Sequence, residues 1–198
     1  MKINIRVIFP IALLFFSCEA YNKLSKSDLE WQPYKEGDKL IFESNRGELD
    51  TIQIEEIKIY SNPNDPLAVF PKMRQTLFVI GERSILEMRA GENGSYIEFT
   101  VRLGSNNLKY PNVVLNIKEM NEMNQDQNNQ YKIEAKEYYD NMKDRVFDLR
   151  YIYWSKKWGY MSLKFKDNYE WHLKSFIRDG KNILGKIGKV SSIKPKKK

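Results

Sequence analysis

Apolar and polar residues alternate along most of this chain, which is the pattern of half-buried β-strands. The alternation is cleanest over residues 96–103, where every second residue is apolar. The Asn93-Gly94 pair just before this run predicts a β-hairpin, because Asn-Gly suits tight hairpin turns. The same pattern recurs over 147–154, 160–165 and 169–174, and the short turns between these runs predict an antiparallel meander.

The isoleucines between residues 51 and 60 change their parity along the chain. Ile52 and Ile54 share one face of an extended strand, whereas Ile57 and Ile59 fall on the other face. One extra residue between the two pairs would return all four side chains to a single face. We therefore expect a β-bulge near residue 55.

About nine or ten strands with short connections predict an all-β, mainly antiparallel fold. Both a barrel and a sandwich fit this pattern, and we favour a barrel-like fold because closing a sheet removes its exposed edges. Aromatic residues make up 13% of the 198-residue chain, in agreement with their preference for strands. After Gly180, the spacing of Ile183, Leu184, Ile187 and Val190 fits one short C-terminal helix.

The first 18 residues have a different organisation. Lys2 and Arg6 precede an apolar run over residues 7–16 that fits a secretory signal. This run is shorter than the roughly 20 residues that a membrane-spanning helix needs. The segment Leu14–Cys18 resembles a lipobox, the cleavage site of bacterial lipoproteins. This resemblance implies that the Cys18 thiol receives a diacylglyceryl group and becomes the first residue after cleavage; an ordinary secretory signal with an incidental cysteine is the alternative.

These features divide the chain into a signal peptide (1–17), a lipidated tether (18–30), a single β-rich domain (31–193) and a basic tail (194–198). The tether is polar and lacks a clear period. The chain has one cysteine, so no disulfide forms within it. The formal net charge is +7, and losing two basic residues with the signal lowers it to +5. Acids and bases alternate rather than gather, which does not fit nucleic-acid binding.

Few residues in the chain could carry catalytic or metal-binding chemistry. His172 is the only histidine, and the alternation places it on the solvent face, opposite Trp171. Residues 180–186 match most of a phosphate-binding loop, but Ile187 stands where the motif needs Ser or Thr. The sequence contains no Gly-x-Ser-x-Gly motif. We therefore expect neither a cofactor nor a metal, and a non-catalytic role.

A set of tryptophan and tyrosine residues forms the candidate contact site. Their rings combine apolar faces with a polar group, so they could line a ligand pocket or a partner surface. Packing in the core and across strands is the alternative. The candidates are Trp31, Tyr34, Trp154, Trp158, Tyr160 and Trp171.

Two parts of the chain resemble small uncharacterised lipoproteins of the Bacteroidota. The first is Trp-x-Pro-Tyr-x-x-Gly-Asp at Trp31–Asp38, and the second comprises Tyr153–Gly159 and Trp171–Leu173. The resemblance implies no particular activity.

Together these features predict an exported, membrane-anchored lipoprotein at the periplasmic face or the cell surface. We expect a module that binds a small apolar ligand or an envelope protein. A structural or assembly factor of the envelope without a small ligand is the alternative, and a hydrolase is the third hypothesis. A large internal apolar cavity would favour the first role, a filled core with an exposed aromatic patch the second, and a cleft with His172 or two converging carboxylates the third.

The lipid anchor can be tested directly at Cys18. The parent protein should incorporate labelled palmitate and sediment with membranes, because two or three acyl chains hold a protein stably on a bilayer. The Cys18→Ala variant should lose the label and move to the soluble fraction. Unchanged fractionation of the variant would contradict lipidation at this residue.

Overall fold

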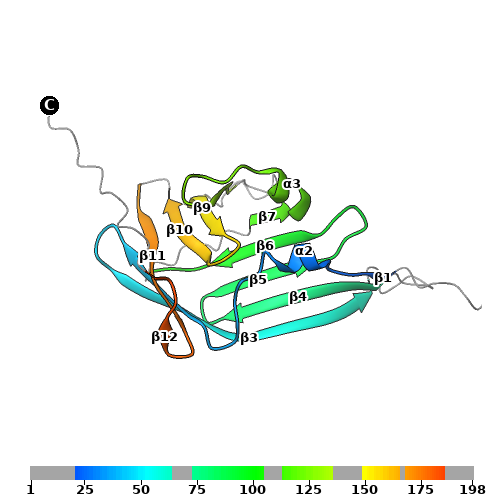
Figure 1. Ribbon diagram of the computed structural model, residues 1–198, viewed down its shortest axis with the longest axis horizontal. Coiled ribbons are helices and arrows are strands. Elements are labelled where there is room, and N and C mark those ends of the chain that lie inside the picture. The colour runs from blue at the N-terminus through cyan, green and yellow to red at the C-terminus, as the bar shows by residue number, and fades with distance from the viewer. Residues whose placement is uncertain (1–20, 64–72, 105–112, 136–148, 166–167, 186–198) are drawn as a thin grey trace, which may run out of the picture.

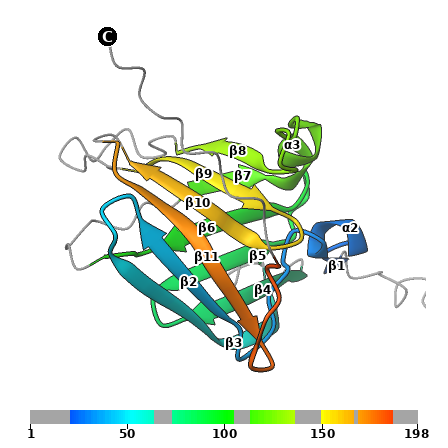
Figure 2. The ribbon, with the colours of Figure 1, turned by 60° about the vertical axis from the view of Figure 1, so that its left-hand side comes forward.

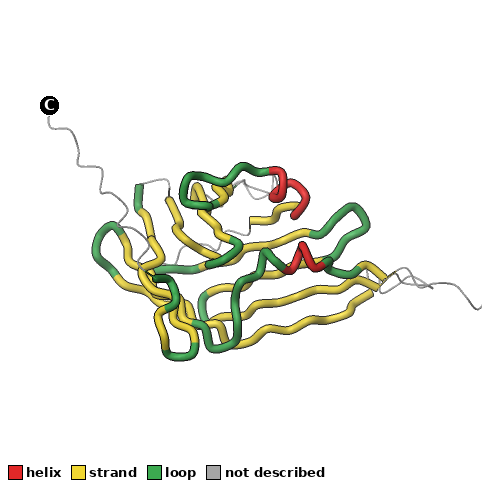
Figure 3. The backbone as a smooth tube through the Cα atoms, viewed as in Figure 1, coloured by secondary structure: helices red, strands yellow, loops and turns green. Residues whose placement is uncertain are grey.

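The computed structural model describes residues 21–63, 73–104, 113–135, 149–165 and 168–185 (Figure 1). Strands dominate this part of the chain, with two short helices, α2 (Lys26–Leu29) and α3 (Ile117–Glu122) (Figure 3). The predicted signal peptide, Cys18 and the basic tail lie outside the described residues.

Ten antiparallel strands form one continuous curled sheet (Figure 2). In chain order they are β2 (Lys39–Ser44), β3 (Leu49–Pro63), β4 (Met73–Gly81), β5 (Ser84–Arg89), β6 (Tyr96–Val101), β7 (Val113–Asn116), β8 (Tyr131–Glu134), β9 (Leu149–Ser155), β10 (Gly159–Phe165) and β11 (Glu170–Arg178). Their order in the sheet is β7-β6-β5-β4-β3-β2-β11-β10-β9-β8. Two further strands, β1 (Tyr21–Asn22) and β12 (Lys181–Asn182), pair with β4 and β11. The prediction of an all-β, barrel-like fold is confirmed.

The predicted bulge lies in β3, at the point where this strand changes its pairing partner. Residues 49–53 pair with β2 and residues 54–63 pair with β4, and the register shifts between Ile54 and Glu56. Gly81 lies at this bend, and a Cβ there would come within 2.7 Å of the Gln53 carbonyl oxygen. A glycine is therefore needed for the strands to approach each other. Ile59 is 54% exposed because the far end of β3 extends beyond the core.

The predicted hairpin and meander are both present. Strands β5 and β6 pair on either side of the turn that contains Asn93-Gly94, and Gly94 has a φ of +116°. Strands β9, β10 and β11 are consecutive neighbours in the sheet. Each of these units has a local pairing that its own turn residues and alternation specify.

Residues 21–30 fall in the expected tether, but the structure gives them defined contacts. β1 pairs in parallel with Met73 and Arg74 of β4. Leu24 is buried, and its backbone N–H donates to Gln75 Oε1 at 3.1 Å. The segment is thus attached to the sheet from its first described residue.

The C-terminal end of the described chain differs from the expected helix. β12 forms a hairpin with β11, and Ile183 continues it by donating its N–H to the Phe176 carbonyl. Ile183 and Leu184 are therefore not helical. Residues 186–193 of the expected helix lie outside the described residues.

Two contacts hold the segment Trp31–Asp38 against strands β10 and β11. The Tyr34 hydroxyl accepts a 2.8 Å hydrogen bond from the Tyr160 backbone N–H. The Asp38 carboxylate is 1% exposed and accepts from Arg178 Nε at 2.8 Å and Nη2 at 2.6 Å. A buried, bidentate arginine pair of this kind holds its partners in one orientation.

Substitution of Gly159 should show how tightly Tyr34 packs against β10. A Cβ on Gly159 would lie 1.8 Å from Tyr34 Oη, and Gly159 has a φ of +76°. Gly159→Ala should therefore lower the free energy of unfolding by about 3 kcal/mol or more, from overpacking and backbone strain together. Urea denaturation followed by circular dichroism would measure the loss.

Gly180→Ala provides the matched control, because Gly180 has a similar φ of +72° but no atom lies within 4 Å of the place that a Cβ would take. It should cost only the backbone strain, about 1–2 kcal/mol. Equal losses in the two variants would contradict a steric role for the Tyr34 ring.

Candidate functional site

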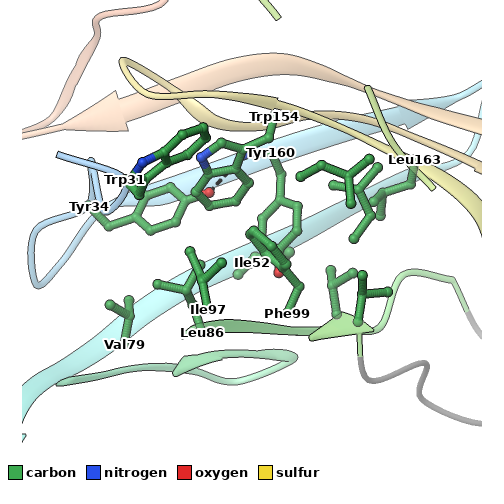
Figure 4. Packing of buried hydrophobic residues seen from close by; sticks show 14 of the residues in the cluster. Trp31, Tyr34, Ile52, Val79, Leu86, Ile97, Phe99, Trp154, Tyr160 and Leu163 are labelled. Carbon is green, nitrogen blue, oxygen red and sulfur yellow. Dashed lines mark hydrogen bonds between the residues drawn. The ribbon is translucent and has the colours of Figure 1, made fainter. Parts of the chain in front are cut away.

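Four of the candidate aromatic residues, Trp31, Tyr34, Trp154 and Tyr160, come together in the interior of the curled sheet (Figure 4). Five of the six are buried, with exposed fractions of 5% or less: Trp31, Tyr34, Trp154, Tyr160 and Trp171. The sixth, Trp158, is partly buried against Phe176, at a ring distance of 6.1 Å. The structure therefore places these side chains in the core, as in the packing alternative.

Ring contacts cross the interior from β6 to β9 and β10, which are not its neighbours in the sheet, and a further ring contact joins β9 to the adjacent β10. Phe99 of β6 lies 4.8 Å from Trp154 of β9, and Trp154 lies 4.8 Å from Tyr160. Trp31 packs at 4.7 Å against Tyr131 of β8. These tilted and edge-to-face contacts fill the space inside the curl, so these rings pack against one another and do not form the walls of an open pocket.

Several polar groups of the aromatic cluster have no partner in the described part of the chain. Trp31 Nε1 donates to Asn121 Oδ1 of α3 at 3.1 Å. By contrast, Trp154 Nε1, Trp171 Nε1 and the Tyr160 hydroxyl are buried without a hydrogen bond. Burial raises the pKa of Tyr160, and burial together with the nearby Tyr160 raises the pKa of Tyr34.

The face of β4, β5 and β6 that points away from the core carries an open hollow, which we call the outer groove. It has a volume of about 640 Å³ and is lined by Phe78, Ile80, Gly81, Glu82, Arg83, Ser84, Ile85, Glu87, Glu98 and Thr100. In the register of the sheet, Ile80 pairs with Ile85, and Ile85 pairs with Thr100. An apolar row therefore crosses β4 and β5 on the surface that faces away from the core.

A row of charged residues borders this apolar row. Glu87 of β5 lies directly opposite Glu98 of β6. Arg89 bridges them, with its Nε 2.8 Å from Glu87 Oε1 and its Nη2 against Glu98 Oε2. The pKa of Glu87 is raised above its usual value, mainly by burial and also by the neighbouring Glu98, although Arg89 lowers it. The outer groove thus combines an apolar centre with a charged rim.

A second, smaller groove contains His172, whose predicted position on the solvent face is confirmed. It has a volume of about 300 Å³, and Asp126, Ser162 and Glu170 also line it. His172 Nε2 is 3.3 Å from Glu170 Oε2, with the histidine side chain 48% exposed. Ser162 lies opposite His172 in the sheet, but the described structure has no hydrogen bond between the two.

This groove brings together a histidine and two carboxylates without the connections of a catalytic relay. Asp126 Oδ1 accepts two backbone hydrogen bonds, from Asn128 at 2.8 Å and Gln130 at 2.9 Å. Glu170 is paired with both Lys164 and His172. Both carboxylates therefore have strong local partners, unlike a general acid in an apolar pocket.

Within the described ranges, no cluster of three or more His, Cys, Asp or Glu residues is arranged to hold a metal ion. No helix in the described part of the chain is both long enough and apolar enough to cross a membrane.

Comparison with protein-family models, curated proteins and solved structures found no match to this chain.

Sequence reasoning missed the outer groove. Its signal was present in the sequence, because Phe78 and Ile80 alternate with the core residues Leu77 and Val79 and make β4 apolar on both faces. A strand of this type has two faces to cover, and only one of them is used in the core.

The buried tyrosines should make stability depend on alkaline pH. An exposed tyrosine in the unfolded chain has a pKa of about 10. Because the pKa values of Tyr34 and Tyr160 are higher in the folded state, their contribution is complete below pH 10. It should fall above this pH, where the unfolded chain releases protons that the folded chain retains.

Absorbance at 295 nm and circular dichroism, recorded together from pH 9 to 12.5, would measure this effect. A late tyrosine titration should coincide with unfolding and should lose amplitude in Tyr160→Phe. Tyr60→Phe, which removes a hydroxyl from a 42% exposed residue, should leave the late step unchanged. Full titration of Tyr160 in a folded protein would contradict its burial.

Proposed function

We propose that this protein is an exported lipoprotein, held on a membrane by lipid on Cys18, that binds an envelope protein through the outer groove. The observation that supports this proposal is the group of apolar side chains, Phe78, Ile80 and Ile85, on the sheet face opposite the filled core. Exposed apolar patches rimmed by polar residues are typical of protein-interaction sites.

The composition of the outer groove supports a protein partner. Apolar side chains lie at its centre, while Glu82, Arg83, Glu87 and Glu98 provide charged groups around it. This is the arrangement of an interface in which a desolvated centre supplies affinity and a polar rim supplies specificity. The internal aromatic residues, by contrast, are engaged with one another and do not offer a free surface.

The filled core also supports a role in envelope structure or assembly without a small ligand. In that role the protein would act through its surface as well. Both roles therefore make the outer groove the contact surface, and they differ in whether the partner is held transiently or built into a permanent assembly.

A photo-cross-linking amino acid placed at Ile85 tests this proposal in intact cells. Ile85 is 43% exposed, so the replacement should be tolerated. We expect one defined protein adduct at this position, and the Phe78→Ser variant should reduce its yield at least severalfold, because the substitution removes apolar contact area from the groove.

The same cross-linker at Leu49 is the matched control, because Leu49 is 61% exposed and lies outside the outer groove. It should not give this adduct. Equal adducts at the two positions, or none at Ile85, would contradict a docking role for the groove.

A further inference from the structure

The N-terminal strand brings the lipid attachment point close to one end of the sheet. Cys18 precedes Tyr21 by three residues, and three extended residues span at most about 11 Å. Tyr21 and Asn22 form β1 and pair with Met73 and Arg74 of β4. On the proposed anchoring at Cys18, this end of the sheet lies within about 11 Å of the lipidated residue.

Two exposed tyrosines, Tyr60 and Tyr96, lie toward this same end. Tyr60, Thr76, Arg89 and Tyr96 form one row across β3 to β6, two residues along β4 from Arg74. Tyr60 is 42% exposed and Tyr96 is 37% exposed. Tyrosine rings are favoured at the boundary between lipid and water, where one end is apolar and the other is hydrated.

Two polar groups at this end lack an acceptor. Asn22 Nδ2 and Arg74 Nε are both buried, and neither donates a hydrogen bond within the described residues. Asn22 and Arg74 are register partners, so their side chains extend from the same face of the sheet. Buried donors without a partner are costly, so an acceptor supplied from outside would stabilise them.

A hollow suited to such an acceptor adjoins Arg74. It has a volume of about 390 Å³, and Arg74, Arg89, Gly91 and Tyr96 contribute to its lining. Arg89 is already paired with two carboxylates, whereas the one interaction of the Arg74 charge found among the described residues is a longer-range electrostatic one with Glu87. Glu92 also lines the hollow, so its negative charge limits the attraction to an anion.

We propose that the β1 end of the sheet faces the membrane and that Arg74, with Asn22 beside it, binds the phosphate of a lipid head group. A phosphate oxygen entering the hollow accepts from the guanidinium of Arg74, which is the group best suited to such anions. This inference rests on the proposed lipid anchor, and it gives the anchored domain a defined orientation.

Vesicle binding tests the phosphate site without the anchor. The mature chain with Cys18→Ala should bind vesicles containing phosphatidylglycerol more tightly than pure phosphatidylcholine vesicles. Arg74→Gln should weaken this binding about fivefold, the effect of one basic residue at an anionic surface. Arg150→Gln, the same change at an exposed arginine of β9, should leave the binding within about twofold of the parent. Equal binding by the parent and Arg74→Gln would overturn the site.

Fluorescence quenching tests the orientation on the membrane. With Cys18 occupied by lipid, a cysteine introduced by Tyr96→Cys is the only thiol available for a fluorescent label. A lipid with a nitroxide on its head group should quench this label several times more strongly than the same label at Leu49→Cys. Equal or reversed quenching would overturn the orientation.

Two further outcomes separate the causes of a failure. If inorganic phosphate alone shifted the Asn22 side-chain amide resonance but binding to vesicles did not depend on Arg74, the site would belong to a free phosphate and the lipid assignment would be overturned. If the parent incorporated no palmitate, the anchor in the proposed function would fail. Arg74-dependent binding of the Cys18→Ala chain to vesicles would then still support the phosphate site.

Discussion

The ring of Tyr34 occupies the space where residue 159 would carry a side chain, and Gly159 leaves that space empty. This contact, with the hydrogen bond from the Tyr160 N–H to the Tyr34 hydroxyl, joins chain segments 126 residues apart. The Asp38–Arg178 pair adds a second connection from the same segment to β11. The packing of the rest of the core depends on these two connections, because they hold the rings of Trp31 and Tyr34 against the rings of other strands. The segments 31–38 and 153–159 are therefore neighbours in space, and their contacts have a structural role.

The filled interior determines which surfaces remain for recognition. β4 contributes Leu77 and Val79 to the core and presents Phe78 and Ile80 on its other face. Because β4 is apolar on both faces and only its inner face is covered by the core, its outer face is left for another molecule. The His172 groove lies on a different part of the sheet and is lined mostly by polar groups that bind one another. For this reason the outer groove is the surface that the proposed function uses.

The N-terminal segment links anchorage to folding in the proposed arrangement. The proposed lipid attachment at Cys18 precedes β1 by three residues, and the chain continues from β1 through the buried Leu24 to the segment Trp31–Asp38. A free tether would let the domain rotate above the membrane, whereas a strand paired with β4 holds the proposed anchor point close to one end of the sheet. In this proposal, the same attachment puts Arg74 and the exposed Tyr96 near the lipid surface. Orientation on the membrane then follows from the fold.

The sequence by itself determined the features that depend on near neighbours: strand alternation, the bulge in β3, the Asn93-Gly94 hairpin, the β9–β11 meander and the solvent position of His172. These follow because local spacing decides which side chains share a face of a strand. Tertiary structure decided which faces lie inside, so only the fold could distinguish aromatic residues that fill a core from those that line a pocket. It also paired β1 with β4, a strand far along the chain, and replaced the start of an expected helix with β12. Pairing between distant segments depends on the free energy of the whole assembled sheet, and local periodicity carries no information about it.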